Sequence, residues 1–364
     1  MVVGIDASNI RTGGGRKHLM KFIDYSIEIN PNVLFILVSN RTINNMFKSN
    51  HRVKCITNTF LNSHNLFAFI SQFFCSYKYF RNNNCDVVFV PGGIFLSKFK
   101  PFYTMSQNML PFDLNELTGF SHFKKLKFKI IRILQLLTFK KSNGVIYLTE
   151  YAKNTIHNYL TDPKKATVIP HGITQQKYNH YNLPHKAFNI LYVSDFLPYK
   201  HNYNVAKAVS ELIYDGVDIN LTLIGKKDKK EFNKINNIIS KSNSLNNKIK
   251  IFDSLNYSEV IKHYKDCSLF LFASTCENLP FIILEAMSYG LPIISTNKKP
   301  MTSIINGKDI FFDSHDINSI KDIILKNMSK EKLLQLSKDN FNSSKNYTWK
   351  NNVFKTLELL SNAS

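Results

Sequence analysis

The chain lacks several features that would assign it to a class at once. None of its apolar runs approaches the roughly 20 residues that a membrane-spanning helix needs. It has only 5 cysteines, and no two of them have the two-residue spacing of a zinc site or redox pair. The first residues contain no basic region followed by the apolar segment of a signal peptide. We therefore expect a cytoplasmic protein with reduced thiols and no membrane-spanning helix.

Basic residues are in large excess over acidic ones. The 364 residues include 47 Lys and Arg against 26 Asp and Glu, which gives a net charge of +21. Such a surplus favours a polyanionic partner: nucleic acid, anionic lipid headgroups or a phosphate-rich substrate. A hydrophobic fraction of 44% excludes general disorder. The length suits two domains, each able to bury its own core.

Apolar segments alternate with amphipathic ones in both halves, which predicts parallel strands joined by helices. Strands are expected at Val2–Ile5, Val33–Val38, Val87–Val90, Gly144–Leu148, Phe188–Val193, Ile219–Ile224, Lys250–Phe252, Ser268–Phe272 and Pro292–Ser295. We predict an α/β protein with two Rossmann-like domains, at residues 1–173 and 188–344, joined by a polar linker at 174–187. A closing helix is expected within 345–364. Ligands should bind in the cleft where the strand carboxyl ends of two facing sheets meet.

The most informative segment spans residues 274–294. A polar loop ends at Pro280, a short helix begins near Phe281, and another strand follows. Such a loop directs backbone N–H groups and the positive end of the helix toward a bound diphosphate. Glu277 lies in the loop, whereas Glu285 lies about one turn inside the helix. The loop residues Asn278, Leu279 and Pro280 are therefore candidate contacts for a bound diphosphate.

This segment resembles the hallmark of the family 4 retaining glycosyltransferases: two Glu separated by seven residues, followed by Ala-Met, a small residue and Gly. The resemblance implies the GT-B fold, with an acceptor-binding first domain, a nucleotide-sugar-binding second domain and the closing helix returning to the first. It also implies that Glu277 holds sugar hydroxyls near the reacting carbon and that Glu285 hydrogen-bonds the ribose. The expected activity is retaining transfer of a sugar in the synthesis of a surface polysaccharide such as O-antigen or capsule.

Other segments extend the resemblance. Lys200 fits the family lysine that neutralises the leaving diphosphate, while Asp195 or Tyr199 stands where the usual Arg is expected. Consecutive glycines after the first strand allow close approach to phosphates. Two more positions lie at strand ends that border the nucleotide base in the family. These segments add four glycines and one serine as donor-binding residues: Gly13, Gly14, Gly15, Gly225 and Ser254.

Where many relatives carry a His that contacts the sugar, this chain has Gln107 and Asn108. Asn108 can hydrogen-bond a sugar hydroxyl, so we count it with Glu277 and Lys200 as catalytic. Its amide cannot shuttle protons. This fits a mechanism in which the departing phosphate accepts the proton of the acceptor. Gln107 and His171, the latter within a recurring Pro-His-Gly segment, are candidate acceptor or sugar contacts.

Residues 123–141 form a basic amphipathic stretch. It could lie on an anionic membrane or pack as a helix of the first domain. We expect a mixture of the two. The aliphatic residues Ile130, Ile133, Leu134 and Leu137 are expected in the core, and Lys124, Lys125, Lys127 and Lys129 near lipid headgroups.

Three functional hypotheses remain open. The first is a metal-independent transferase without a cofactor, because the Asp-any-Asp metal anchor of the other large glycosyltransferase fold is absent. Its partners would be a nucleotide sugar, a lipid-linked oligosaccharide and the cytoplasmic face of an anionic inner membrane. The second is a nucleic-acid-binding protein, although no known nucleic-acid-binding motif is present. The third is a non-catalytic sugar-nucleotide-binding relative, suggested by the missing Arg and His. The sequence does not specify the donor sugar, base, acceptor or linkage.

Overall fold

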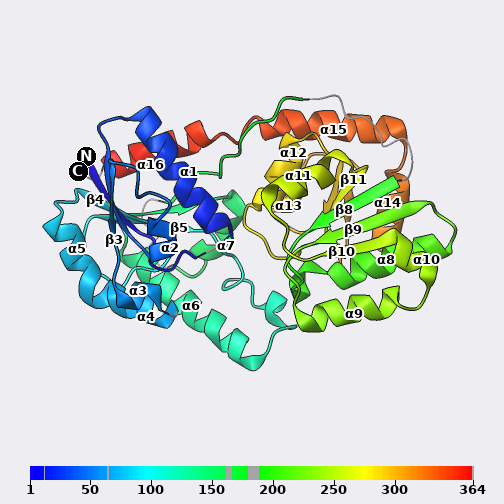
Figure 1. Cartoon of the computed structure of the whole chain (residues 1–364), viewed down its shortest axis with the longest axis horizontal. Coiled ribbons are helices and arrows are strands. Elements are labelled where there is room, and N and C mark those ends of the chain that lie inside the picture. The colour runs from blue at the N-terminus through cyan, green and yellow to red at the C-terminus, as the bar shows by residue number, and fades with distance from the viewer. Residues whose placement is uncertain (12, 64, 161–165, 179–187, 363–364) are drawn as a thin grey trace. The chain divides into compact units, whose positions relative to one another are not determined.

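A computed structural model describes residues 1–11, 13–63, 65–160, 166–178 and 188–362 (Figure 1). The chain divides into two compact units. The first comprises Met1–Phe112, His122–Gly172 and Tyr347–Ser364, and the second comprises Asp113–Ser121 and Ile173–Asn346. Within the described residues, both units are α/β structures built on a parallel sheet. The predicted fold class is confirmed.

The sheet of the first unit has the strand order β3-β2-β1-β4-β5-β6-β7. Its strands are β1 (Val2–Asp6), β2 (Leu34–Val38), β3 (Val53–Ile56), β4 (Val87–Val90), β5 (Phe102–Ser106), β6 (Gly144–Tyr147) and β7 (Ala166–Val168). Its helices are α1 (Gly13–Ile29), α2 (Arg41–Asn44), α3 (Thr59–Asn62), α4 (Asn65–Ser71), the π-helix η1 (Gln72–Ser76), α5 (Tyr77–Asn82), α6 (His122–Lys141), α7 (Glu150–His157) and α16 (Trp349–Ser361).

The sheet of the second unit has the order β10-β9-β8-β11-β12-β13. Its strands are β8 (Phe188–Val193), β9 (Ile219–Ile224), β10 (Ile249–Phe252), β11 (Leu269–Phe272), β12 (Ile293–Thr296) and β13 (Phe311–Phe312). Its helices are α8 (Asn202–Tyr214), α9 (Lys229–Ile239), α10 (Asn243–Lys248), α11 (Tyr257–Lys265), α12 (Phe281–Ser288), α13 (Met301–Ile304), α14 (Ile317–Lys326) and α15 (Lys330–Ser344), with 3-10 turns η2 (Asn115–Leu117) and η3 (Pro198–Lys200). In each sheet the chain builds outward from the first strand, β1 or β8, to one side and then continues on the other side, beginning with β4 or β11. This reversal of strand order is typical of Rossmann-like folds.

Two predicted boundaries need correction. Asp113–Ser121, predicted within the first domain, belongs to the second unit. The reason is close packing: a Cβ on Gly119 would lie 2.4 Å from the Cβ of Pro198. The start of the predicted linker also packs into the second unit, since Gln175 Nε2 donates a hydrogen bond to the carbonyl of Ser344 at 2.9 Å. Residues 179–187 of that linker lie outside the described part of the chain.

The closing helix α16 packs against α1 within the first unit, as the fold prediction required. Gly172 allows this return, because a Cβ there would lie 2.3 Å from the backbone N of Trp349. Trp349 is buried, and the centroid of its ring lies 5.9 Å from that of the His18 ring. The centroid of the His171 ring lies 5.1 Å from that of His18. Two histidines and a tryptophan thus fix the end of the chain to α1.

Acid should destabilise this cluster. Burial lowers the pKa of His18 from 6.5 to about 4, so the unfolded chain takes up a proton before the folded one does. The stability is fully present above pH 6.5 and falls as the pH drops toward 4, by about 3 kcal/mol for this one group. We expect His18→Phe to flatten the pH dependence of urea unfolding between pH 7 and 4.5, followed by Trp349 fluorescence. An unchanged slope would mean that His18 titrates normally.

Candidate active site

The site forms at the reversal point of the second sheet, where β8 and β11 lie side by side. The chain leaves β8 through Ser194–Leu197 and the turn η3, and leaves β11 through the loop Ala273–Pro280 that precedes α12. In open parallel sheets the carboxyl ends of the strands at a reversal point form a ligand-binding position. Lys200 stands at the end of the first connection and Glu277 in the second.

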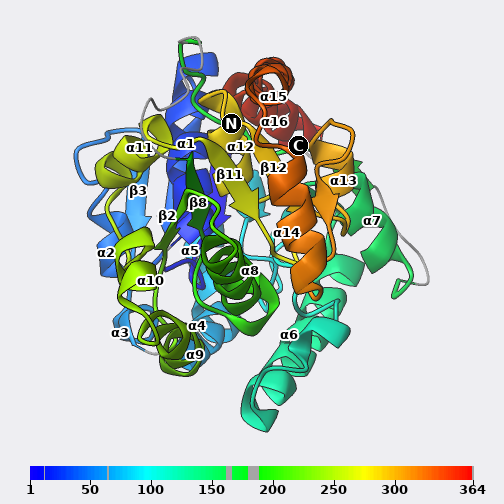
Figure 2. The ribbon, with the colours of Figure 1, turned by 90° about the vertical axis from the view of Figure 1, so that its right-hand side faces the viewer.

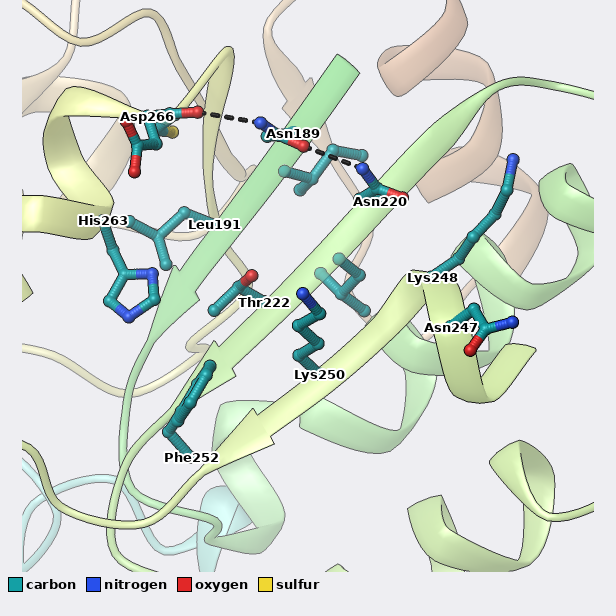
Figure 3. Close-up of a pocket in the computed structure, with 13 residues that line it drawn as sticks. Asn189, Leu191, Asn220, Thr222, Asn247, Lys248, Lys250, Phe252, His263 and Asp266 are labelled. Carbon is teal, nitrogen blue, oxygen red and sulfur yellow. Dashed lines mark hydrogen bonds between the residues drawn. The ribbon is translucent and has the colours of Figure 1, made fainter. Parts of the chain in front are cut away.

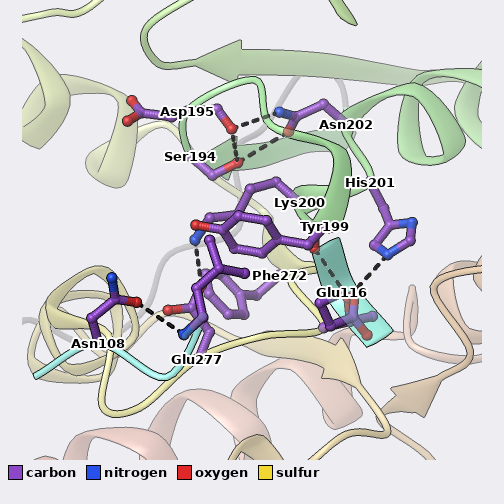
Figure 4. A network of polar contacts seen from close by, with 12 residues as sticks. Asn108, Glu116, Ser194, Asp195, Tyr199, Lys200, His201, Asn202, Phe272 and Glu277 are labelled. Carbon is purple, nitrogen blue, oxygen red and sulfur yellow. Dashed lines mark hydrogen bonds and ion pairs between the residues drawn. The ribbon is translucent and has the colours of Figure 1, made fainter. Parts of the chain in front are cut away.

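Lys200 and Glu277 form an ion pair across these two loops (Figure 4). Their side chains are 14% and 13% exposed, so the pair is largely removed from water. The ammonium also lies 5.0 Å from the centroid of the Tyr199 ring and 5.8 Å from that of Phe272. Burial alone would lower the pKa of Lys200, but the Glu277 carboxylate holds it above its ordinary value. Lys200 therefore stays charged.

A set of hydrogen bonds fixes the two loops to each other. The backbone N–H of Thr275 donates to the carbonyl of Tyr199 at 2.9 Å, and the Tyr192 hydroxyl donates to the carbonyl of Lys200 at 2.6 Å. The Thr275 hydroxyl donates to the Glu116 carboxylate, which comes from the segment Asp113–Ser121 (Figure 4). Sequence reasoning missed these supporting residues, because backbone partners and a segment that changes unit leave no motif.

The surroundings of the pair are rich in carboxylates. Burial and then the charges of Asp113, Glu277 and Glu116 raise the pKa of the Cys276 thiol. Asp195 does not replace the missing arginine, because its side chain accepts a hydrogen bond from the backbone N–H of Lys226 at 3.1 Å. The cation at Lys200 thus stands among several acids, and an anionic ligand would have to compete with Glu277 for it.

The strand ends next to the pair hold two predicted donor residues. Gly225 has a φ of 159°, and a Cβ there would lie 2.0 Å from the carbonyl oxygen of Ser194. Its N–H donates to the carbonyl of Phe252 at 3.2 Å, which joins the ends of β9 and β10. Ser254 follows β10 and is exposed. Gly225 therefore lets the ends of β8 and β9 approach closely, and Ser254 is accessible beside them.

Most of the predicted donor contacts in the loop before α12 and in α12 itself are buried. Asn278 and Leu279 are buried, and Pro280 caps the first turn of α12. Glu285 lies on α12 and is also buried; besides burial, its charge contributes to raising the pKa of three tyrosines, Tyr257, Tyr264 and Tyr289. Glu285 is therefore placed near phenolic side chains, and its contact with a ribose stays a prediction.

The remaining predicted residues lie in the first unit and make a second group. Gly13 has a φ of 67° and begins α1, where Gly13 and Gly14 are exposed. A Cβ on Gly15 would lie 3.5 Å from Oε1 of Gln107, so the glycine turn and Gln107 are neighbours. Asn108 is exposed, and its Oδ1 accepts a hydrogen bond from the N–H of Leu110 at 3.0 Å.

His171 does not join this group. It is buried beside His18 in the core of the first unit, and burial together with the nearby charges of His18 and Lys17 keeps its pKa well below the ordinary value. His171 therefore packs in the core of the first unit, and its acceptor or sugar contact stays a prediction.

A separate hollow of about 250 Å³ lies on one face of β8, β9 and β10 (Figure 3). Asn189 Nδ2 donates to the carbonyl of Asp266 at 3.0 Å, and Asn220 Nδ2 donates to Oδ1 of Asn189 at 3.0 Å. Lys250 and His263 also line it. None of the predicted donor residues lines this hollow, so it is distinct from the Lys200–Glu277 site.

The prediction of which α6 residues lie in the core is wrong for three of them. Ile130, Ile133 and Leu137 are exposed, whereas Gln135, Thr138 and Phe139 are buried. The polar residues hold the helix: the Thr138 hydroxyl accepts a hydrogen bond from the N–H of Phe95 at 3.0 Å. Of the predicted membrane lysines, Lys124, Lys127 and Lys129 are exposed and Lys125 is half-buried. None of the helices in the described ranges has the length and apolar character to cross a bilayer.

Comparison with known proteins agrees with this architecture. Residues 174–342 match the sequence model of the family "Glycosyl transferases group 1". Protein CapJ of Staphylococcus aureus is 24% identical over 205 residues, which cover 56% of this chain and 51% of CapJ. The capsular polysaccharide biosynthesis glycosyltransferase CapH of the same organism is 23% identical over 207 residues, 54% of this chain and 57% of CapH. The chain thus spans about half the length of these curated relatives.

Solved structures match over the full chain. Sucrose-phosphate synthase from Thermosynechococcus elongatus superposes with a TM-score of 0.79 at 12% identity, covering 100% of this chain and 98% of the synthase. Alr3699/HepE from Anabaena, in complex with UDP and glucose, gives 0.72 at 15% identity, with 100% of both chains covered. The protein therefore has the GT-B fold of two Rossmann-like domains, and residues 174–342 of its second unit resemble the group 1 glycosyltransferases. The resemblance inferred from the paired glutamates is confirmed.

Proposed function

We propose that the protein transfers a sugar from a nucleoside diphosphate donor, with retention at the anomeric carbon, to a lipid-linked or saccharide acceptor in surface polysaccharide synthesis. The observation that carries the proposal is the buried Lys200–Glu277 ion pair at the reversal point of the second sheet. A largely buried ammonium that pairs with a carboxylate at a ligand-binding position is suited to exchange that carboxylate for a phosphate.

The geometry suggests how the two side chains would share the work. A diphosphate binding at Lys200 would neutralise the ammonium and release Glu277 from the ion pair. The freed carboxylate would then accept hydrogen bonds from sugar hydroxyls. As the bond from the anomeric carbon to the phosphate oxygen breaks and the acceptor oxygen bonds to that carbon, Lys200 would stabilise the charge on the leaving diphosphate. A phosphate oxygen would take the proton of the acceptor. This scheme assigns no step to a metal ion.

Relatives support the substrate classes. The structures of HepE contain UDP, UDP with glucose, or UDP-glucose, which makes a uridine diphosphate sugar the first donor to test. The name of CapH indicates capsule synthesis, which favours a surface polysaccharide. The net charge of +21 supports a site of action on the cytoplasmic face of an anionic membrane.

The proposal is tested by donor turnover. The purified protein is incubated with UDP-glucose, UDP-N-acetylglucosamine or GDP-mannose, and release of the nucleoside diphosphate is measured with and without EDTA. We expect slow hydrolysis of one donor that EDTA does not abolish. If the protein binds a donor tightly but neither hydrolyses it nor transfers its sugar to any sugar or lipid-linked acceptor tried, it is a non-catalytic sugar-nucleotide-binding relative.

Glu285 gives a second, more local test. We expect Glu285→Ala to raise the donor KM about tenfold and to change kcat little, because a lost ribose contact weakens substrate and transition state alike. Glu231→Ala is the matched control, since Glu231 on α9 is similarly buried and lies in the same unit. A donor KM that is equal in both variants would remove Glu285 from the donor site.

A further inference from the structure

The π-helix η1 in the first unit buries its polar residues and exposes its aromatic ones. Gln72 and Ser76 are fully or almost fully buried, whereas Phe73 is 55% exposed and Phe74 is 68% exposed. This is the reverse of the pattern that water favours for a helix on a protein surface. The arrangement therefore indicates that something other than water covers the phenylalanines when the protein acts.

Specific hydrogen bonds hold the helix in this orientation. Gln72 Nε2 lies 2.9 Å from Oδ1 of Asp6 and 2.9 Å from the carbonyl of Ile94, and Ser76 Oγ donates to Oδ2 of Asp6 at 3.0 Å. Asp6 is buried at the end of β1, and burial raises its pKa despite these bonds. Turning η1 to bury Phe73 and Phe74 would leave Asp6 without these partners, so the exposure is built into the fold.

Neighbouring side chains enlarge the exposed area. The rings of Phe73 and Phe74 lie 4.9 Å apart, and those of Phe60 and Phe67 lie 6.4 Å apart. We call the exposed apolar residues of this region the aromatic face: Phe60, Phe67, Ile70, Phe73, Phe74 and Tyr77. Single exposed apolar residues are ordinary on protein surfaces, but six of them on the four consecutive helices α3, α4, η1 and α5 are not.

Helix α6 adds a second exposed row beside this face. Its residues Phe123, Leu126, Ile130, Ile133 and Leu137 are exposed at spacings of three and four, with Phe123 at 87%. Both views of the chain place α3, α4 and α6 at the same edge of the first unit, the lower edge in each picture (Figures 1 and 2). Helices α3 and α4, which carry part of the aromatic face, thus share one edge with α6, although they come from distant parts of the sequence.

The charge of the sequence around the aromatic face and α6 indicates what covers them. The sequence contains no Asp or Glu from Thr57 to Cys85 or from Leu117 to Thr149, whereas both stretches contain Lys and Arg. A second copy of the chain docking through this face would bring two basic surfaces together and repel. An anionic bilayer offers both an apolar interior and a complementary charge.

We propose that the aromatic face inserts into the headgroup and upper acyl region of an anionic bilayer, together with the apolar row of α6. This rests on the membrane association in the proposed function and names a contact surface for it. Phe73 and Phe74 enter deepest, because η1 presents them furthest from its polar, buried side. The lysines of α6 contact the headgroups.

A tryptophan probe tests the insertion. The chain has one tryptophan, Trp349, which is buried and gives a constant background. In Phe74→Trp, we expect a blue-shifted emission and at least twofold quenching when vesicles of phosphatidylcholine with 30% phosphatidylglycerol carry bromine on their acyl chains. Phe354→Trp is the matched control, since Phe354 is an exposed phenylalanine of α16 in the same unit, and its emission should not change. Vesicle binding without quenching of the Phe74→Trp probe overturns the proposal.

A loss variant separates this inference from the proposed chemistry. We expect Phe73→Ser with Phe74→Ser to weaken binding to these vesicles at least tenfold while donor hydrolysis stays unchanged. If the parent protein is instead a dimer that this variant dissociates, the face is a contact between copies and the proposal fails. If donor turnover is absent but the probe is quenched, the proposed activity fails and the membrane contact stands.

Discussion

Glu277→Gln should lower sugar transfer about a hundredfold or more, a loss of roughly 3 kcal/mol in transition-state stabilisation. The amide keeps the shape of the side chain but removes the charge that faces Lys200. In the proposed mechanism the carboxylate accepts hydrogen bonds from the sugar as positive charge develops on its ring, so the loss should appear in kcat more than in the donor KM. Single-turnover measurements with a radiolabelled donor would separate the two.

A second effect of Glu277→Gln has to be controlled. Removing the acid leaves a buried ammonium without its partner, which destabilises the loops as well as the transition state. Urea unfolding of Glu277→Gln measures this loss directly. Glu231→Gln controls for losing a paired, largely buried carboxylate away from the site: Glu231 is 10% exposed and pairs at 2.7 Å with Lys234, which is 45% exposed. If turnover in Glu277→Gln stays within a factor of two of that in Glu231→Gln, Glu277 has no catalytic role.

Changing Lys124, Lys125, Lys127 and Lys129 together to Gln should weaken binding to anionic vesicles by up to several hundredfold at low salt. Each lysine near an anionic surface contributes about 1 kcal/mol, and salt screens most of that attraction. Lys124, Lys127 and Lys129 are exposed, so they can reach headgroups, whereas half-buried Lys125 should contribute less. Vesicle sedimentation across a salt series measures the effect, and activity on a lipid-linked acceptor should fall with it.

The control for this variant has to lose the same charge elsewhere. Four exposed lysines of the second unit serve: Lys229, Lys230, Lys241 and Lys308. Their replacement by Gln should change vesicle binding only slightly, and hydrolysis of the donor alone should stay near the parent rate in both variants. Equal losses in the two variants would show that net charge, and not the surface of α6, attracts the membrane.

The parts of the fold that could be predicted are those with a strong local pattern. The alternation of apolar and amphipathic segments located the central strands β1, β4, β8 and β11, because buried parallel strands are nearly continuous apolar runs. The strands β3, β5, β7 and β13 were missed: β7 and β13 have only three and two residues, and the interior strand β5 alternates apolar residues with Thr104 and Ser106. The Lys200 and Glu277 positions followed from motifs on consecutive residues at strand ends.

What the sequence could not predict depends on contacts between distant segments. The apolar spacing of α6 predicted a buried stripe, but Gln135 and Thr138 take the inner side through hydrogen bonds and close packing with the loop after β4. His171 lies in a motif segment, yet its neighbours His18 and Trp349 are far away in the sequence. Periodicity identifies a helix with an apolar side, but it does not tell whether protein or another phase covers that side.

The order of the chain has a consequence for synthesis on the ribosome. The second unit draws on Asp113–Ser121 and Ile173–Asn346, so all of its residues have been made before Tyr347 is added. The first unit needs α16, whose residues begin at Trp349. Although its sheet is synthesised first, the amino-terminal unit must wait for the final helix to cover His18 and α1. During translation the later unit can finish folding first, and the earlier one stays incomplete until the last turns emerge.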